Sequence, residues 1–254
     1  MRACKLVIGL LAAATLPAAA QQYPDRPIRL VVPYAPGGGT DLTSRLIALR
    51  LTESFKQQVI VDNRAGGASN IGAEITARSA PDGYTIMMAG ISFSINVSIF
   101  SKLGYDPIKD FDPVSLVATV PLIVVVHPSV PATNIKELIA LARAKPGTLN
   151  YASGGAGTAN HIAGELFKYM TGTDIVHVPY KGGGPALADV VGGQVQLLFN
   201  TMTSTVGFMS PAGFRVSFKL RADDMAASCA STAIVRSTAA SQRCVNTAGP
   251  CECA

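Results

Sequence analysis

The chain has 254 residues, of which 48% are hydrophobic and 15% are charged, a composition that provides a large core and excludes a disordered protein. Most of the formal net charge of +5 comes from the two ends, because residues 1–20 hold two basic residues and residues 209–254 hold five basic and three acidic ones. Residues 21–208 carry 14 basic against 13 acidic residues. This balance, the absence of Trp and the aromatic content of 6% argue against a nucleic-acid partner and against a stacking platform for sugars or single strands.

The first twenty residues have the three parts of a secretory signal. Two basic residues precede an apolar run from Leu6 to Ala14, and three alanines end at Ala20. The apolar run is shorter than the roughly 20 residues that a bilayer-spanning helix needs. We therefore expect a signal peptide at 1–20, export with cleavage near Ala20, and no stable membrane insertion of the mature chain.

Strand and helix patterns alternate through the first half of the chain, after an extended lead-in that contains two prolines. The expected elements are a strand at 28–33, a helix from Asp41, a strand at 59–61, a helix ending near Ser79 and a strand at 84–89. Leu42, Leu46 and Leu49 fall near helical spacing in the first helix, and Thr40 or Asp41 is placed to cap its first turn. Such alternation predicts a mainly parallel sheet covered by helices.

Two serines, Ser92 and Ser94, follow the strand expected at 84–89. They lie past its carboxyl end, the edge at which open α/β sheets bind ligands, so both are candidate ligand-binding residues. The alternative, to which we give equal weight, is that they are ordinary loop or helix-capping hydroxyls. Farther along, Pro121 interrupts an apolar stretch, and we expect the boundary between lobe 1 (21–120) and lobe 2 (121–208) there.

The second half repeats the alternation. The expected strands are 122–126, 149–152, 175–178 and 195–199, and the expected helices are 134–144, 158–170 and 185–191. Thr133 or Asn134 would cap the first of these helices, and Pro185 suits the first position of the last one. Residues 121–208 therefore form a second α/β lobe.

Three glycine-rich corners, at 33–41, 151–158 and 178–184, each join an expected strand to an expected helix. Glycine allows backbone N–H groups to approach a ligand closely, and the first turn of a helix favours an anion. Glycine is also common wherever a strand turns sharply into a helix, but three such corners on both halves favour a carboxylate held between two lobes. Lys181 and Arg64 are candidate charge partners, with solvated surface as the simpler interpretation.

Catalytic and cofactor patterns are nearly absent. Ser92 and Ser153 both miss the nucleophile-elbow pattern, and the three histidines do not have metal-site spacing. The glycine loops lack the complete dinucleotide fingerprint and the Lys-Ser/Thr ending of a phosphate-binding loop. The sequence therefore predicts no enzyme, no cofactor and no metal, and an exported hydrolase that acts through Ser92 or Ser153 is the alternative.

The pattern changes beyond about Met209. Periodicity fades, and four of the five cysteines fall in the last 26 residues. A zinc or disulfide site has little support there, because the spacings fit no compact zinc pattern and no histidine is near. We expect residues 209–254 to be a non-native or disordered tail, as a change of reading frame would produce, and the C-terminal portion of the fold to be incomplete.

Five motifs then occur in order between Tyr23 and Phe208. They are YAPGGGTD at 34–41, NRAGGASNIG at 63–72, DGYT at 82–85, NYASGGAGTANH at 150–161 and VPYKGGG at 178–184. Together they resemble the Bug family, the solute-binding proteins of bacterial tripartite tricarboxylate transporters. The resemblance implies an α/β, two-lobed periplasmic-binding-protein-like (type II) fold and a periplasmic receptor. Such a receptor closes on a carboxylate-bearing or other anionic solute and delivers it to membrane transporter subunits.

The resemblance also implies ligand contacts at motif positions in both lobes: Tyr34, Gly38, Gly39, Thr40, Ser153, Gly157, Thr158 and His161. Ser92, Ser94, Lys181 and Asn200 complete the candidate ligand-binding set. Family members continue past the strand that ends near Asn200 with more of lobe 2 and a return crossing that completes lobe 1, and residues 209–254 do not resemble that continuation. Besides the hydrolase, a truncated, non-functional remnant of the binding protein therefore stays open as an alternative.

Overall fold

The computed structural model describes residues 23–208, 215–219 and 230–237. The expected signal peptide, its cleavage site near Ala20 and all five cysteines lie outside these residues, as does the rest of the segment 209–254. Within the described part, no helix is both long and apolar enough to cross a membrane.

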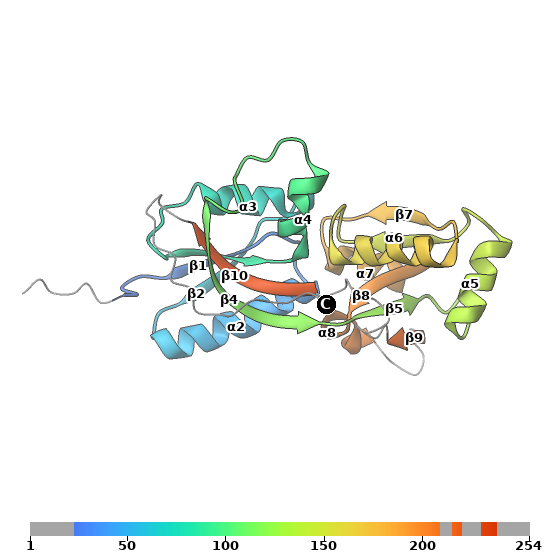
Figure 1. The fold of residues 1–254 in the computed structure, drawn as a ribbon. Helices are drawn as coiled ribbons and strands as arrows, with labels where there is room; N and C mark the ends of the chain where they lie inside the picture. Colours follow the sequence, from blue (N-terminus) through green and yellow to red (C-terminus); the bar gives the residue numbers. More distant parts are fainter. Residues whose placement is uncertain (1–22, 209–214, 220–229, 238–254) are drawn as a thin grey trace, which may run out of the picture.

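Lobe 1 is a five-stranded sheet with helices on both faces (Figure 1). Its elements are β1 (Ile28–Val32), α2 (Gly39–Phe55), β2 (Val59–Asn63), the 3₁₀ turn η1 (Gly67–Ser69), α3 (Asn70–Ala77), β3 (Thr85–Ala89), α4 (Ile91–Ile99) and β4 (Phe111–Val120). The sheet order is β2-β1-β3-β10-β4, where β10 is Ala230–Ser237. β1 runs parallel to β2 and β3, and β10 runs antiparallel to β3 and β4.

Lobe 2 lies beside lobe 1 and has a second five-stranded sheet (Figure 1). Its elements are β5 (Leu122–Val126), α5 (Ile135–Ala144), β6 (Asn150–Ser153), α6 (Ala159–Thr171), β7 (Val176–Pro179), α7 (Gly183–Val191), β8 (Leu197–Thr201), α8 (Met202–Thr205), η2 (Val206–Phe208) and β9 (Arg215–Lys219). The order is β7-β6-β8-β5-β9, with β6 parallel to β7 and β8, and β5 antiparallel to β8 and β9. The expected two-lobed α/β class is confirmed.

Each sheet has a core on both faces. Alternate residues of a strand point to opposite faces, so Val124 of β5 packs with Leu138 of α5 while Val125 packs with Leu187 of α7. In lobe 1, Val31 packs toward Ala73 of α3, and the opposite face of the same sheet packs toward α2. The cores hold the carboxyl ends of the parallel strands in place, and the loops that follow those ends build the site.

The chain passes between the two sheets twice. β4 ends at Val120 and β5 begins at Leu122, so the sheet changes at Pro121. The chain returns between β9 in the sheet of lobe 2 and β10 in the sheet of lobe 1. This differs from the expectation for 209–254, because Arg215–Lys219 and Ala230–Ser237 are paired strands. The sequence RVSFK alternates apolar and polar residues, a strand signal that the Ala- and Ser-rich composition around it obscures.

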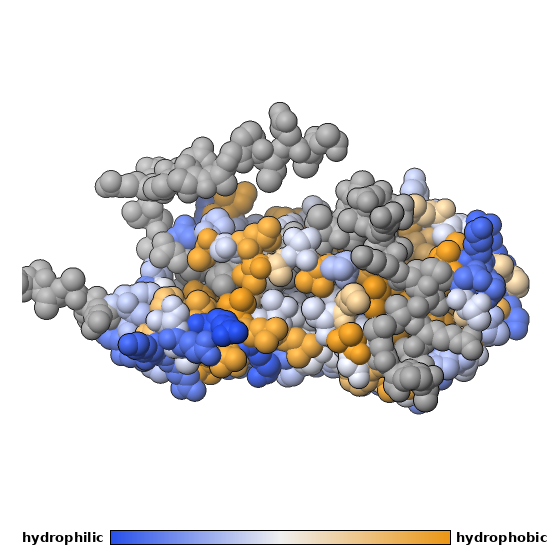
Figure 2. Space-filling view, turned by 90° about the horizontal axis from the view of Figure 1, so that it is seen from below, coloured by the Kyte–Doolittle hydropathy of each residue, from blue (hydrophilic) through white to orange (hydrophobic). Residues whose placement is uncertain are grey.

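Helix α2 turns a different side to the core than its leucine spacing suggests. Leu46 and Leu49 are 66% and 57% exposed, whereas the buried residues of the helix are Asp41, Ser44 and Ala48. Hydrophobic surface accordingly covers much of the side of the molecule where α2 lies (Figure 2). The small side chains let the helix approach the sheet, and the spacing therefore located the helix but not its buried side.

Helix starts follow capping rules in some places and depart from them in others. The Asn134 side chain accepts a hydrogen bond from the Glu137 N–H and caps α5, as expected. Neither Thr40 nor Asp41 caps α2, because Gly38 occupies that position. Pro185 is the third residue of α7, not the first. The segment after β3, for which no helix was predicted, forms helix α4 directly after Gly90.

Candidate functional site

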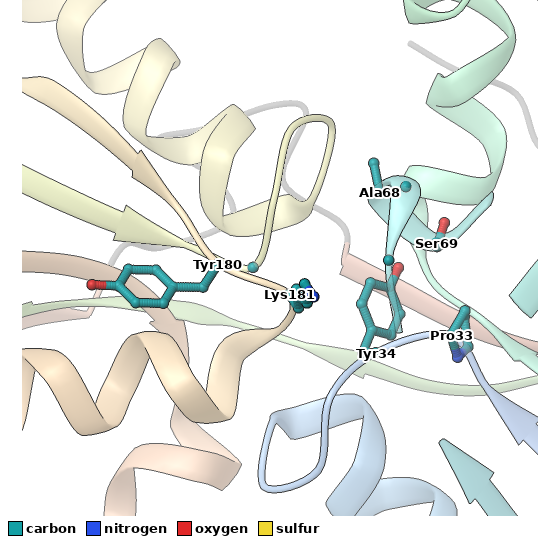
Figure 3. A pocket seen from close by; sticks show the side chains of 9 residues that line it. Pro33, Tyr34, Ala68, Ser69, Tyr180 and Lys181 are labelled. Atoms are coloured by element: carbon teal, nitrogen blue, oxygen red, sulfur yellow. The ribbon is translucent and has the colours of Figure 1, made fainter. Parts of the chain in front are cut away.

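A small pocket opens between the two lobes (Figure 3). Nine residues line it, in segments that follow β1, β2, β6 and β7: Pro33, Tyr34, Gly66, Gly67, Ala68, Ser69, Gly154, Tyr180 and Lys181. All four strands run parallel to a neighbour, so these segments gather at the carboxyl edges of the sheets, where open α/β sheets place their ligands. The cavity volume of about 60 Å³ holds a few water-sized groups.

The wall on the lobe 1 side is the loop Gly66–Ser69, whose backbone is unusual. Its four residues have φ values of +128°, +55°, +54° and +79°, and the last two belong to Ala68 and Ser69. Non-glycine residues in this region each cost about 1–3 kcal/mol and persist where the surroundings hold them. Asn96 provides part of that support, because its Nδ2 donates to the Ala68 carbonyl at 2.8 Å.

Tyr34 forms the next part of the wall, and its hydroxyl points toward the loop (Figure 3). The hydroxyl is hydrogen-bonded to Ser92 Oγ, which lies 3.0 Å from Ser69 Oγ. Burial raises the pKa of Tyr34 and outweighs the opposing hydrogen bonds from Ser92 and Ser69. Tyr34 therefore remains a neutral phenol that links the pocket wall to helix α4.

The glycines of the first and third corners pack against each other across the seam between the lobes. The Ala35 N–H donates to the Lys181 carbonyl at 3.0 Å. A Cβ on Gly38 would lie 3.4 Å from the Gly183 nitrogen, and a Cβ on Gly184 would overlap the Pro36 carbonyl oxygen. These glycines let two backbones meet, so Gly38 lies in the seam and not in the pocket wall.

The start of α2 is held by a buried carboxylate. Asp41 accepts hydrogen bonds from the Gly37 N–H at 2.9 Å, from Asn63 Nδ2 at 2.9 Å and from Arg45 Nε at 3.0 Å. Burial alone would raise the pKa of Asp41, but these hydrogen bonds and the charge of Arg45 outweigh it and the pKa is lowered. The first corner thus already has its own anion, which occupies the Gly37 N–H.

The second corner, 151–158, is braced from within lobe 2. Ser153 Oγ lies 2.5 Å from His177 Nε2 and accepts from the Gly155 N–H at 3.1 Å. Thr158 Oγ1 donates to the Gly155 carbonyl at 2.7 Å, and the Gly157 N–H donates to His161 Nδ1 at 3.2 Å. The side chains of Ser153, Thr158 and His161 therefore shape the corner, and Gly154 is its residue in the pocket wall.

Ser153 and His177 make a serine–histidine pair, which bears on the hydrolase alternative. Burial and, to a smaller extent, the neighbouring His161 ring, 4.3 Å away between centroids, together lower the pKa of His177 to about 4. A general base works best with a pKa near the working pH. Within residues 23–208 no carboxylate hydrogen-bonds to His177, so the pair lacks the third group of a catalytic triad.

Of the other candidates from the sequence, only Lys181 lines the pocket with Tyr34. Ser92 is buried behind Tyr34, and Ser94 is exposed on another side of α4. Gly39 packs against the Thr201 side chain, and Asn200 Nδ2 donates to Thr205 Oγ1 at 3.0 Å. The backbone carbonyl of Thr40 accepts a hydrogen bond from Ser44 Oγ, and Arg64 Nε donates to the Asp62 carboxylate.

Most of the residues in the pocket wall were not predicted from the sequence. Pro33, the loop Gly66–Ser69 and Tyr180 line the pocket but were outside the candidate set. The available signal was the glycine pair Gly66-Gly67 shortly after the strand that ends at Asn63, at the same sheet edge as the first corner. Tyr180 contributes near its backbone, since its ring turns away from the cavity and its hydroxyl donates to Asp189 at 2.6 Å (Figure 3). No group of three or more metal-type ligands occurs among the residues that the structure describes.

Comparisons with known proteins agree with this architecture. A family model described as "Tripartite tricarboxylate transporter family receptor" matches residues 43–242. Protein BugT of Bordetella pertussis is 37% identical over 222 residues, which are 85% of this chain and 68% of BugT. The chain spans between 54% and 68% of the length of BugT and two further curated relatives.

Solved structures of periplasmic binding proteins have the same fold as this chain. Rpa4515 of R. palustris, solved with adipate, is 33% identical with a TM-score of 0.76, and the match covers 85% of this chain and 77% of that one. MatC of Rhodopseudomonas palustris, solved with bound malate, is 25% identical with a TM-score of 0.77, over 85% of this chain and 79% of MatC. Both ligands are carboxylates.

Proposed function

The chain belongs to the family of tripartite tricarboxylate transporter receptors, and from this premise we propose that it captures a small carboxylate-bearing solute between its two lobes in the periplasm. The solute then passes to the membrane subunits of a transporter. Export through a signal peptide cleaved near Ala20 and the lack of catalytic activity are parts of the same proposal. The carboxylates bound to Rpa4515 and MatC support this solute class.

The observation that carries the proposal is the pocket between the lobes, walled by the backbone of Gly66–Ser69 and by Lys181. Backbone N–H groups in turns of this kind and a nearby ammonium suit an anion. A hydrogen bond to a charged group contributes about 1.5–3 kcal/mol, so four or five reach the roughly 8 kcal/mol of micromolar binding after ordering losses.

Closure would be driven by contacts that the solute makes with both lobes. A ligand shifts a conformational equilibrium only by its differential affinity for the two states. The pocket has Gly66–Ser69 on one side and Gly154 with Lys181 on the other, so a solute there contacts both lobes only when they are together. The hydrogen bond between Ala35 and Lys181 links the same two lobes beside the pocket.

Isothermal titration calorimetry with monocarboxylates, dicarboxylates, tricarboxylates and amino acids tests the proposal, with neutral sugars as the control. We expect saturable heat with at least one carboxylate and none with the sugars. The absence of heat with every carboxylate would contradict the proposal. An ester-hydrolysis assay with the wild type and Ser153→Ala tests the hydrolase alternative, and we expect equal background rates.

A further inference from the structure

Ser92 is a fully buried serine that joins two residues of the pocket wall without lining the pocket itself. Its Oγ is hydrogen-bonded to the Tyr34 hydroxyl and lies 3.0 Å from Ser69 Oγ. Tyr34 follows β1, whereas Ser69 belongs to the loop that follows β2, so the two wall residues come from different segments. Ser92 thus connects both segments to helix α4, which lies behind the wall.

The core of lobe 1 holds Ser92 in place. The residue lies in the first turn of α4, and the next residue, Phe93, packs in the core. The Phe93 ring stacks on Tyr105 at 5.7 Å between centroids and meets Phe111 edge-on at 4.9 Å. Buried aromatic pairs of this kind contribute more than their buried area alone. The start of α4 is therefore a firm support for the wall.

The loop that Ser92 holds depends on contacts from outside it. Ala68 and Ser69 have φ values of +54° and +79°, a conformation that persists in such residues where the surroundings hold it. Asn96 donates from Nδ2 to the Ala68 carbonyl at 2.8 Å. Because Ser92 and Asn96 are four residues apart, they lie on the same side of α4. One side of this helix therefore holds two consecutive residues of the loop.

The chain leaves room for the Tyr34 hydroxyl directly before α4. A Cβ built on Gly90 would lie 2.8 Å from the Tyr34 hydroxyl oxygen, so the phenol would have to move. Gly90 has φ −108°, a value that other residues also adopt, so its backbone conformation does not require glycine. A methyl group at Gly90 would therefore displace Tyr34 without removing any hydrogen-bonding group.

We propose that Ser92 is a positioning residue for solute binding, which holds Tyr34 and Ser69 in the pocket wall and does not itself contact the solute. This inference rests on the proposed function and names a residue that prepares its site. The apparent dissociation constant of a solute rises as the fraction of protein with a binding-competent wall falls. Loss of the Ser92 hydroxyl lowers that fraction, so the solute has to order the wall as it binds.

Calorimetry with adipate and malate, the carboxylates in the structures of Rpa4515 and MatC, measures the effect on affinity. We expect Ser92→Ala to bind about five- to tenfold more weakly than the wild type. Ser94→Ala is the matched control, because it removes an exposed hydroxyl from the same helix, and it should bind like the wild type. Gly90→Ala should weaken binding as Ser92→Ala does, since it displaces Tyr34. Wild-type affinity in Ser92→Ala would overturn the inference.

A double-mutant cycle distinguishes positioning from a general structural effect. Tyr34→Phe removes the hydroxyl that Ser92 holds, and Ser92→Ala is then measured in both backgrounds. We expect Ser92→Ala to lower the affinity by a smaller factor in Tyr34→Phe than in the wild type, because one of its two contacts is already lost. A loss by the same factor in both backgrounds would show that Ser92 does not act through Tyr34, and would overturn the inference.

Hydrogen exchange in the solute-free protein tests the role of Ser92 without any solute. We expect the amides of residues 66–69 to exchange about fivefold or more faster in Ser92→Ala than in the wild type, and those of the corner 151–158 to be unchanged. Equal exchange of the loop in both proteins would overturn the inference. Ser69→Ala removes the same contact from the side of the loop, and it takes the place of Ser92→Ala in each comparison if that variant does not fold.

The outcomes separate the two proposals. If adipate or malate binds the wild type and Ser92→Ala equally well, the role of Ser92 is overturned and the receptor function stands. If no carboxylate binds the wild type, the receptor function fails and the role in solute binding fails with it, whereas faster exchange of the loop in Ser92→Ala would still show that Ser92 holds the wall.

Discussion

The loop Gly66–Ser69 in lobe 1 and the corner Gly182–Gly184 in lobe 2 are both rich in glycine and both follow a strand, but they use glycine differently. In the loop the backbone adopts positive φ values and forms the pocket wall. In the corner, Gly184 lies so close to Pro36 of lobe 1 that a Cβ would overlap its carbonyl oxygen. One region depends on the conformational freedom of glycine, and the other depends on its lack of a side chain.

Because the two regions use glycine differently, substitutions in them should have different effects: one on the stability of a single lobe, the other on the closure of the two lobes. Adding a methyl group to the loop strains one lobe and leaves the other untouched, whereas adding it to the corner keeps each lobe intact and holds the lobes apart. Substitutions of the same kind, glycine to alanine, should therefore affect stability in the first region and solute-driven closure in the second.

The largest expected effect is that of Gly184→Ala. The new methyl group meets backbone of the other lobe, which cannot move aside as a side chain can, so the closed state is disfavoured. We expect solute affinity to fall about 100-fold while the unfolding transition of lobe 2 stays close to wild type. Calorimetry and X-ray scattering with and without solute measure the affinity and the closure.

Gly207→Ala is the matched control for Gly184→Ala, because nothing lies within 4 Å of a Cβ at that glycine. It should bind and close like the wild type. Wild-type affinity in Gly184→Ala would mean that the seam between the corners does not form in the bound state.

The second test is Gly66→Ala against Gly67→Ala. Gly66 has φ +128° with ψ 163°, a region open essentially to glycine alone, whereas Gly67 at φ +55° lies in the left-handed region that other residues visit. We expect Gly66→Ala to lower the free energy of unfolding by about 2–3 kcal/mol and Gly67→Ala by about 1 kcal/mol. Urea denaturation followed by circular dichroism measures both, and equal losses would contradict the conformational explanation.

Most of the strands and helices could be predicted from the sequence, because their local sequence patterns favour the same structure that packing in the core stabilises. The run Leu122–Val126 is a buried strand as expected, and Asn134 caps α5. The two strands after residue 209 were not expected, since their partners are far away in sequence and only pairing makes the segments strands. The strand β4 was also not identified, because its exposed edge position leaves Val114 and Leu116 without a clear alternation.

The site was less predictable than the fold for a physical reason. A glycine-rich corner has the same kind of sequence whether its backbone contacts a ligand or packs against another backbone. Which of the two contacts it makes depends on how the lobes meet. Of the predicted ligand-binding residues, Tyr34 and Lys181 line the pocket, whereas Gly38 lies in the seam. The loop at Gly66 and the role of Asn96 depend on contacts between residues about 28 positions apart, which no local pattern encodes.

The third prediction concerns the pH dependence of stability, which should differ between the loop of lobe 1 and the corner of lobe 2. Loop Gly66–Ser69 is held by Asn96 and Ser92, which do not titrate, whereas the corner 151–158 is held by histidines. Burial lowers the pKa of His177 to about 4 from its ordinary 6.5, so the neutral form stabilises the fold above about pH 6.5 and this contribution is lost as the pH falls toward 4. We expect a loss of about 1–2 kcal/mol, reduced from the full linkage value because the ring is partly exposed to solvent.

The comparison between wild type and His177→Gln isolates this effect, since glutamine keeps a hydrogen-bonding group near Ser153 but does not titrate. Carboxylates that titrate below pH 5 affect both proteins equally. The difference in urea midpoint between the two should therefore shrink from pH 7 to pH 4. A constant difference over that range would exclude His177 as the pH-dependent brace of the corner.

The smallest expected effect on solute affinity is that of Lys181→Met. This variant removes the charge beside the corner Gly182–Gly184 and leaves the backbone of the corner unchanged. The Lys181 carbonyl holds Ala35 across the seam, and this bond is kept in the variant, while the exposed ammonium at the pocket is lost. Because exposed charges are screened by solvent, we expect only a two- to fivefold loss of carboxylate affinity, and a weaker dependence on salt than in the wild type. Lys145→Met, on the far side of lobe 2 at the end of α5, is the control and should change neither. A loss as large as that of Gly184→Ala would show that the side chain of this corner, and not the meeting of its backbone with lobe 1, provides most of the binding energy.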